Sequence, residues 1–122
     1  MYDKEEFPVA LAIASRELDG VTILELSGRI TLGEGSVQLR DAIRDLIGKG
    51  QQRILLDLGD VSYIDSSGLG ELVSAYTSAR NQGADLKLLK LTKKVHDLLQ
   101  LTKLFTVFDI YDDEASAVAS YK

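Results

Sequence analysis

The uninterrupted apolar run Ile54-Leu55-Leu56 constrains the fold of this chain more than any other feature. A strand with one wet face alternates apolar and polar residues, whereas a run without alternation is typical of a strand buried on both faces of a parallel sheet. Parallel neighbours are joined by crossover connections, which are usually helices. The segment from Arg53 to Leu58 therefore predicts an inner parallel strand of an α/β domain.

Helical spacing of apolar residues flanks this strand on both sides. The stripe before it consists of Leu39, Ala42, Ile43, Leu46 and Ile47, and Gly48 and Gly50 supply the helix stop. The stripe after it consists of Leu69, Leu72, Val73, Tyr76 and Ala79, and Gly83 ends that helix. The elements expected further along are a strand over 85–91, a short helix from 95 towards 101, a strand over 106–110 and a helix over 112–119.

The chain opens with the pattern of a β-hairpin. Apolar residues run from Val9 towards Leu18, the pair Asp19-Gly20 is typical of a two-residue hairpin turn, and a second strand follows over 21–28. Val21 and Ile23 fall on one face of that strand and their neighbours on the other, which predicts a half-buried strand antiparallel to the first. We expect residues 1–8 to form a flexible tail and residues 9–122 to form one domain.

Together these patterns predict the fold class α/β. An opening antiparallel hairpin followed by β-α alternation gives the order β-β-α-β-α-β-α-β-α. We expect one mixed sheet of four to five strands packed against about four helices. The length of 122 residues is common for a single domain and is sufficient for one buried core.

Composition and charge restrict the possible functions. The net charge of −5 argues against direct binding of nucleic acid, which needs a basic surface. The absence of cysteine fits a reducing compartment, and neither a signal peptide nor a membrane-spanning run of ~20 apolar residues is recognisable, so we expect a cytoplasmic protein. Five lysines are interpreted as a solvated face, which is the simpler alternative to a phosphate-binding patch: Lys87, Lys90, Lys93, Lys94 and Lys103.

The segment Asp65-Ser66-Ser67-Gly68-Leu69-Gly70 lies where the inner strand gives way to a helix. Two hydroxyls beside a carboxylate allow three interpretations: a helix cap, a catalytic nucleophile, or a hydroxyl that is modified. A hydrolase elbow needs Gly-x-Ser-x-Gly, and the glycine before Ser67 is missing. The single histidine, His96, falls in a predicted surface helix, and no metal-binding spacing is present. These residues argue against an enzyme and against a metal site.

A second glycine cluster, Gly33-Glu34-Gly35-Ser36-Val37-Gln38, also precedes a helix. It matches half of a dinucleotide-binding fingerprint, but Gln38 stands where the third glycine belongs, and Glu34 would face the pyrophosphate. A helix N-terminus with Ser36 or Gly35 near the cap explains the cluster more simply. We therefore expect no cofactor.

The serine pair suits a helix cap, but a cap does not explain the whole motif. One side chain is enough to cap a helix, and glycine in a first helical turn costs ~1 kcal/mol against alanine. Gly68 and Gly70 therefore suggest that something must approach the backbone closely. A phosphate on serine would be tolerated by the free N–H groups and the dipole of the helix, whereas a partner docked there would be repelled by it.

Three segments resemble the STAS domain family (sulfate transporter and anti-sigma factor antagonist). "YIDSSGLGELVSAY" behind the strand "RILLDL" is similar to the family's signature. "VTILELSGRITLGEGSVQLRDAI" is similar to its second strand and first helix, and "GADLKLLKLTKKVHDLLQLTKL" to a later strand–helix unit. The resemblance covers nearly the whole chain and implies a single STAS-type domain over residues 9–122.

Within that family, a free-standing domain resembles the bacterial anti-anti-sigma factors. The resemblance implies a non-enzymatic protein that binds a serine-kinase, ATPase-like anti-sigma factor and so releases a sigma factor. It implies that the kinase phosphorylates Ser67 to end the binding, that a metal-dependent serine phosphatase restores it, and that the domain is a monomer or weak homodimer. The residues it places at the partner surface are Asp65, Ser66, Gly68, Leu69, Gly70, Thr31, Gly33, Glu34 and Gly35.

Two other functions stay open at this point. The domain could serve as a STAS scaffold or accessory subunit of a larger assembly, such as a transporter ATPase or a stress-signalling complex. It could also be a small hydrolase that uses Ser67 and His96. One departure from the family concerns the partner: many anti-sigma antagonists carry an acidic residue where this chain has Thr31.

Overall fold

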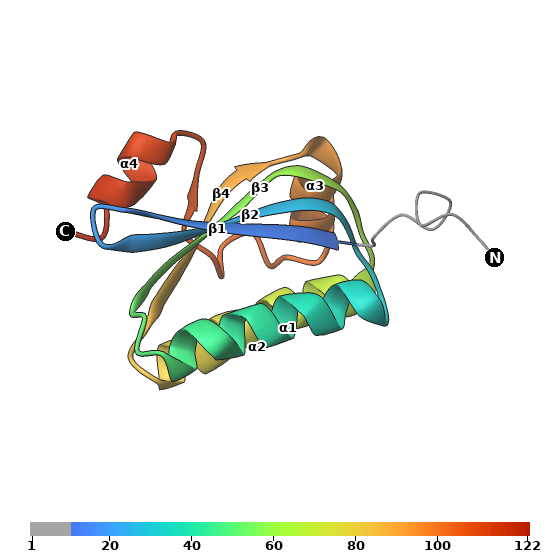
Figure 1. The fold of residues 1–122 in the computed structure, drawn as a ribbon. Coiled ribbons are helices and arrows are strands. Elements are labelled where there is room, and N and C mark those ends of the chain that lie inside the picture. The colour runs from blue at the N-terminus through green and yellow to red at the C-terminus, as the bar shows by residue number, and fades with distance from the viewer. Residues whose placement is uncertain (1–10) are drawn as a thin grey trace.

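The computed structural model describes residues 11–122, which form five strands and four helices (Figure 1). The strands are β1 (Leu11–Leu18), β2 (Val21–Ile30), β3 (Arg53–Ile64), β4 (Asp85–Leu91) and β5 (Ile110–Tyr111). The helices are α1 (Glu34–Gly48), α2 (Ser66–Asn81), α3 (Lys93–Leu101) and α4 (Glu114–Ala119). The expected α/β order is confirmed. The tail expected over residues 1–8 lies outside the described residues, as do the first two residues of the expected opening strand.

The sheet is mixed, and its strands lie in chain order, β1-β2-β3-β4-β5. β1 and β2 are antiparallel and are joined by Asp19 and Gly20, whose φ angles are 52° and 80°. Positive φ at both central positions defines the type I′ turn, which matches the twist of the two strands, so the predicted hairpin is confirmed. The other neighbouring strands pair in parallel.

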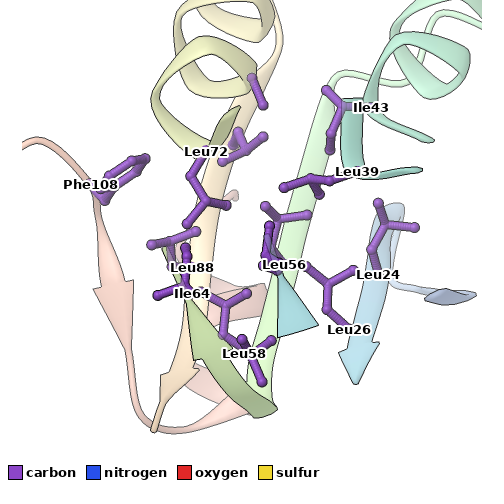
Figure 2. Packing of buried hydrophobic residues seen from close by; sticks show 14 of the residues in the cluster. Leu24, Leu26, Leu39, Ile43, Leu56, Leu58, Ile64, Leu72, Leu88 and Phe108 are labelled. Atoms are coloured by element: carbon purple, nitrogen blue, oxygen red, sulfur yellow. The ribbon is translucent and has the colours of Figure 1, made fainter. Parts of the chain in front are cut away.

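α1 and α2 lie side by side against one face of the sheet (Figure 1). The steps from β2 to β3 and from β3 to β4 run in the same direction, so right-handed crossovers place both helices on the same face. Leu39 and Ile43 of α1 lie over Leu24 and Leu56 of the sheet (Figure 2). Leu72 of α2 points towards Leu88, and all these side chains belong to the main core.

α4 covers part of the opposite face and forms a second, smaller core (Figure 1). Its Ala117 and Val118 pack in one cluster with Val21 and Ile23 at the start of β2, both of which are fully buried. The prediction that the second strand is half-buried is therefore wrong for its first four residues, which are all buried. The covering helix lies more than 80 residues further along the chain, so the local pattern of β2 could not reveal it.

Lys87 of β4 is buried beneath the end of α4, which contradicts the expected solvated lysine face at this position. Its side chain is 7% exposed, and its ammonium group donates to Ser120 Oγ at 2.8 Å. The same nitrogen lies 4.5 Å from the ring centroid of Tyr121 and 3.7 Å from Asp85 Oδ2. A buried ammonium group needs such partners, because an unpaired one is strongly disfavoured.

Three strands differ in length from the prediction. β2 runs two residues beyond the expected end at 28, to Ile30. β3 continues past Leu58 to Ile64, and register shifts between it and its neighbours accommodate Gly59 and Asp60 in the strand. The last strand is shorter than the expected 106–110, because turns occupy the residues before Ile110. The backbone N–H of Val107, inside the expected strand, donates to Leu104 O at 3.0 Å and is therefore not available to a sheet.

Candidate functional site

The turns before α1 and α2 meet at the carboxyl edge of the sheet. Because β2 and β3 are parallel neighbours, the helices that follow them begin at the same end, as Figure 1 shows. The backbone N–H of Asp65 donates to Ile30 O at 3.3 Å, which joins the two strand ends directly. In open α/β sheets this edge is where binding surfaces are usually built. We call residues 31–37 and 65–70 together the serine edge.

Asp65 holds the serine edge together. Its Oδ1 accepts from Gly68 N at 2.8 Å and so caps α2, while its Oδ2 accepts from Leu32 N at 3.0 Å and so fixes the turn before α1. The N–H of Gly68 is the main cause, and that of Leu32 the second cause, of the lowered pKa of the Asp65 carboxyl, because both bonds favour its charged form. Of the three interpretations of the motif, the helix cap therefore applies to Asp65 and not to either serine.

Two glycines let the helices press against the end of β2. A Cβ at Gly68 would lie 2.0 Å from Ile30 O, and one at Gly35 would lie 2.7 Å from Arg29 O. The sequence indicated a close approach to the backbone at Gly68, and the approaching group is β2 of the same domain. At Gly70, by contrast, no heavy atom of residues 11–122 would lie within 4 Å of an added Cβ. That position is open to the outside.

The two serines occupy the first two positions of α2. Ser66 is exposed and Ser67 is half-buried. The N–H of Ser67 also contributes to the lowered pKa of Asp65, which places the backbone of this serine at the carboxylate. A group attached to Ser67 would thus stand at the positive end of α2 and beside a negative charge.

The turn between β2 and α1 is tightly bonded and carries an exposed leucine that sequence reasoning missed. Gly33 is the N-cap residue, with φ 96° and no side-chain cap, where Ser36 or Gly35 was expected near the cap. Ser36 instead donates to Thr31 O through both its N–H and its hydroxyl. Leu32 is 77% exposed. A leucine among glycines and polar residues is a weak signal in sequence, because only the fold shows whether such a residue is buried.

The structure places all ten predicted site residues on the serine edge, at different depths. The exposed members are Gly33, Glu34, Ser66 and Gly70; the half-buried ones are Thr31, Asp65 and Ser67; the buried ones are Gly35, Gly68 and Leu69. Leu69 is 5% exposed and belongs to the main core. Leu69 therefore supports the turn from beneath. The outer surface of the serine edge consists of its exposed and half-buried members.

His96 lies apart from this arrangement. Its ring packs edge-on against Phe105 at 4.9 Å between centroids, and its Nδ1 lies 3.5 Å from Asp97 Oδ1. Over residues 11–122, no hydrogen bond joins it to Ser67, and no three histidine or acidic side chains gather into a group that could hold a metal. In the same part of the chain, no helix has the length and apolarity needed to cross a membrane.

The fold and the site define a class of protein: a small α/β domain with a hairpin-led mixed sheet and a serine turn at its carboxyl edge. The model of the STAS domain family matches residues 12–117. The chain belongs to the STAS domain family, as the sequence motifs indicated.

Its relatives include anti-sigma factor antagonists. The chain is 32% identical over 100 residues to the anti-sigma F factor antagonist of Paenibacillus polymyxa, which covers 81% of this chain and 85% of that protein. It matches the crystal structure of a candidate anti-sigma factor antagonist of Thermotoga maritima with a TM-score of 0.81 and 29% identity, over 88% of this chain and 92% of that one. SpoIIAA of Bacillus in its phosphorylated form shares the fold, with a TM-score of 0.70 and 18% identity over 91% and 100% of the two chains.

Proposed function

We propose that this protein is an anti-sigma factor antagonist that is switched off by phosphorylation of Ser67. In its unmodified form it binds a cytoplasmic serine-kinase anti-sigma factor and so releases the sigma factor. The kinase then phosphorylates Ser67, and a metal-dependent serine phosphatase restores the active form. The position of Ser67, half-buried in the first turn of α2 and beside Asp65, is the observation that carries the proposal.

The proposal separates the effect of a phosphate on the fold from its effect on binding. The second position of α2 lies at the positive end of the helix dipole, so the domain itself tolerates a phosphate there. The same group adds about −1.5 to −2 charges at pH 7 to an edge that already carries Asp65 and the exposed Glu34. A partner surface that complements the unmodified edge would then face like charge, which costs several kcal/mol.

The family relationship supports the choice of partner. Relatives of this chain are named for acting against anti-sigma factors, and SpoIIAA, which has this fold, exists in a phosphorylated form. The members of the serine edge that reach the outside, among them Thr31 and Ser66, would form the surface that the kinase covers. We expect the free domain to be a monomer or a weak homodimer.

The test uses paired baits in lysate of the source organism. Ser67→Ala should retain a serine kinase that is identified by mass, and Ser67→Asp should lose it. Ser74→Asp is the matched control, because Ser74 is an exposed serine of the same helix two turns further along, and it should retain the kinase. The purified kinase should add one phosphate to the wild-type chain and none to Ser67→Ala.

Equal retention of one partner by both Ser67 baits would contradict the switch. It would instead favour a scaffold or accessory subunit of a larger assembly.

A further inference from the structure

Leu32 is an apolar side chain that the structure holds outside its own cores. It is 77% exposed, and it belongs to neither apolar cluster of the described chain. Single exposed leucines are common on protein surfaces and need no explanation by themselves. This one differs because the backbone that carries it is fixed from both sides.

Three observations show that the turn presents Leu32 in one conformation. The N–H of Leu32 donates to Asp65 Oδ2 at 3.0 Å. The next residue, Gly33, has φ 96°, which favours glycine. The residue before, Thr31, accepts two hydrogen bonds from Ser36, at 3.0 Å from its N–H and 2.7 Å from its hydroxyl. The leucine is thus displayed on a rigid turn and is not the tip of a loose loop.

Leu32 also shares its anchoring group with the proposed phosphorylation site. One carboxylate, that of Asp65, receives the N–H of Leu32 on one oxygen and caps the helix of Ser67 with the other. The turn of Leu32 therefore adjoins the first turn of α2, and a protein surface that extends from Ser67 across Asp65 reaches it. Val37, in the first turns of α1, is a second exposed apolar residue of the serine edge, at 40%.

We propose that Leu32 is the apolar anchor of the partner interface and that the anti-sigma kinase offers it an apolar socket next to its phosphorylation centre. This inference rests on the proposed function and names the chemistry of its partner surface. A preorganised anchor loses little conformational freedom on binding, and buried anchors at the centre of an interface dominate affinity. The charged and polar residues around it, such as Glu34 and Ser66, then form the wet rim.

The test measures affinity for the purified kinase identified with the Ser67→Ala bait. Truncating a fully buried leucine to alanine removes about three carbon groups, so Leu32→Ala should bind about 50-fold more weakly, and Leu32→Met should stay within about threefold of wild type. Leu18→Ala is the control, because Leu18 is an exposed leucine beside the hairpin turn, at the other end of the sheet, and it should bind like wild type. Thermal unfolding of all variants confirms that each is folded.

The outcomes separate the two proposals. If Leu32→Ala binds within twofold of wild type while Ser67→Asp does not bind, the apolar anchor is refuted and the phosphorylation switch stands. If Leu32→Ala and Leu18→Ala weaken binding equally, the anchor is refuted as well. If no kinase binds the wild-type chain, both proposals fall together.

Discussion

Replacing Gly68 by alanine is the sharpest test of how the serine edge is built. The added Cβ would lie 2.0 Å from Ile30 O and 2.8 Å from Ile30 C, where a real Cβ does not come closer than 3.0 Å. The obstacle is backbone of a central strand and cannot rotate away. α2 must therefore move away from β2 by roughly 1 Å, and that movement pulls Gly68 N away from its acceptor on Asp65, now at 2.8 Å.

The magnitude follows from three contributions. Overpacking against rigid surroundings costs up to ~3 kcal/mol. Loss of the Asp65 cap adds ~1 kcal/mol. Alanine returns ~1 kcal/mol through its higher helix propensity. The free energy of unfolding should therefore fall by about 3 kcal/mol.

Gly70→Ala is the matched control, because it makes the same chemical change in the same turn. No atom of the described chain obstructs a Cβ there, so only the propensity gain of up to ~1 kcal/mol remains, and this variant should be slightly more stable than wild type. Urea unfolding followed by far-UV circular dichroism gives both values if the slopes agree. The reasoning is refuted if Gly68→Ala is as stable as Gly70→Ala.

Further predictions concern the two polar centres of the fold. Asp65→Ala should lower the free energy of unfolding by ~1 kcal/mol at neutral pH, because α2 loses its cap. Since the pKa of Asp65 is lowered on folding, this contribution is complete above its ordinary value of 3.8 and disappears as pH falls through the folded pKa. Acid titration of unfolding would contradict this if the gap between the two proteins widened as pH falls below 3.8. Lys87→Met should cost ~1–3 kcal/mol, because Ser120 loses its donor, and hydrogen exchange should show α4 opening first; unchanged protection of α4 would contradict the role of Lys87. Burial raises the pKa of Tyr121, whose hydroxyl donates to Ile54 O, so absorbance titration should find one tyrosine that stays protonated well above pH ~10, and Tyr121→Phe should remove it.

Local sequence patterns predicted most of the fold. The two-residue turn at Asp19 and Gly20 and the apolar stripes of α1 and α2 depend on neighbours within a few residues, and each lies where the sequence predicted it. The final strand was predicted too long because Phe108 is apolar whether it lies in a strand or, as here, packs into the main core from a turn. Apolarity reports burial, but it does not report which backbone partners are free.

Some features of the candidate site could likewise be predicted from local sequence, and others depend on the fold. The motif Asp65-Ser66-Ser67 was visible in sequence because two hydroxyls and a carboxylate before a helix are a local feature. The second bond of Asp65, to Leu32, joins residues 33 positions apart and could not be predicted from either segment alone. Gly68 was recognised as unusual, but only the position of β2 shows that the close approach comes from the domain itself.

The sequence by itself determined the element order, the hairpin, the inner parallel strand and the serine motif, because hydrophobic periodicity and turn chemistry act over a few residues. The tertiary structure decided three further features: α4 buries Lys87, Asp65 joins two turns, and Leu32 stays outside both cores. Each of these depends on the position of a strand or helix distant in sequence. Crossover direction and packing set those positions, and no local pattern of residues records them.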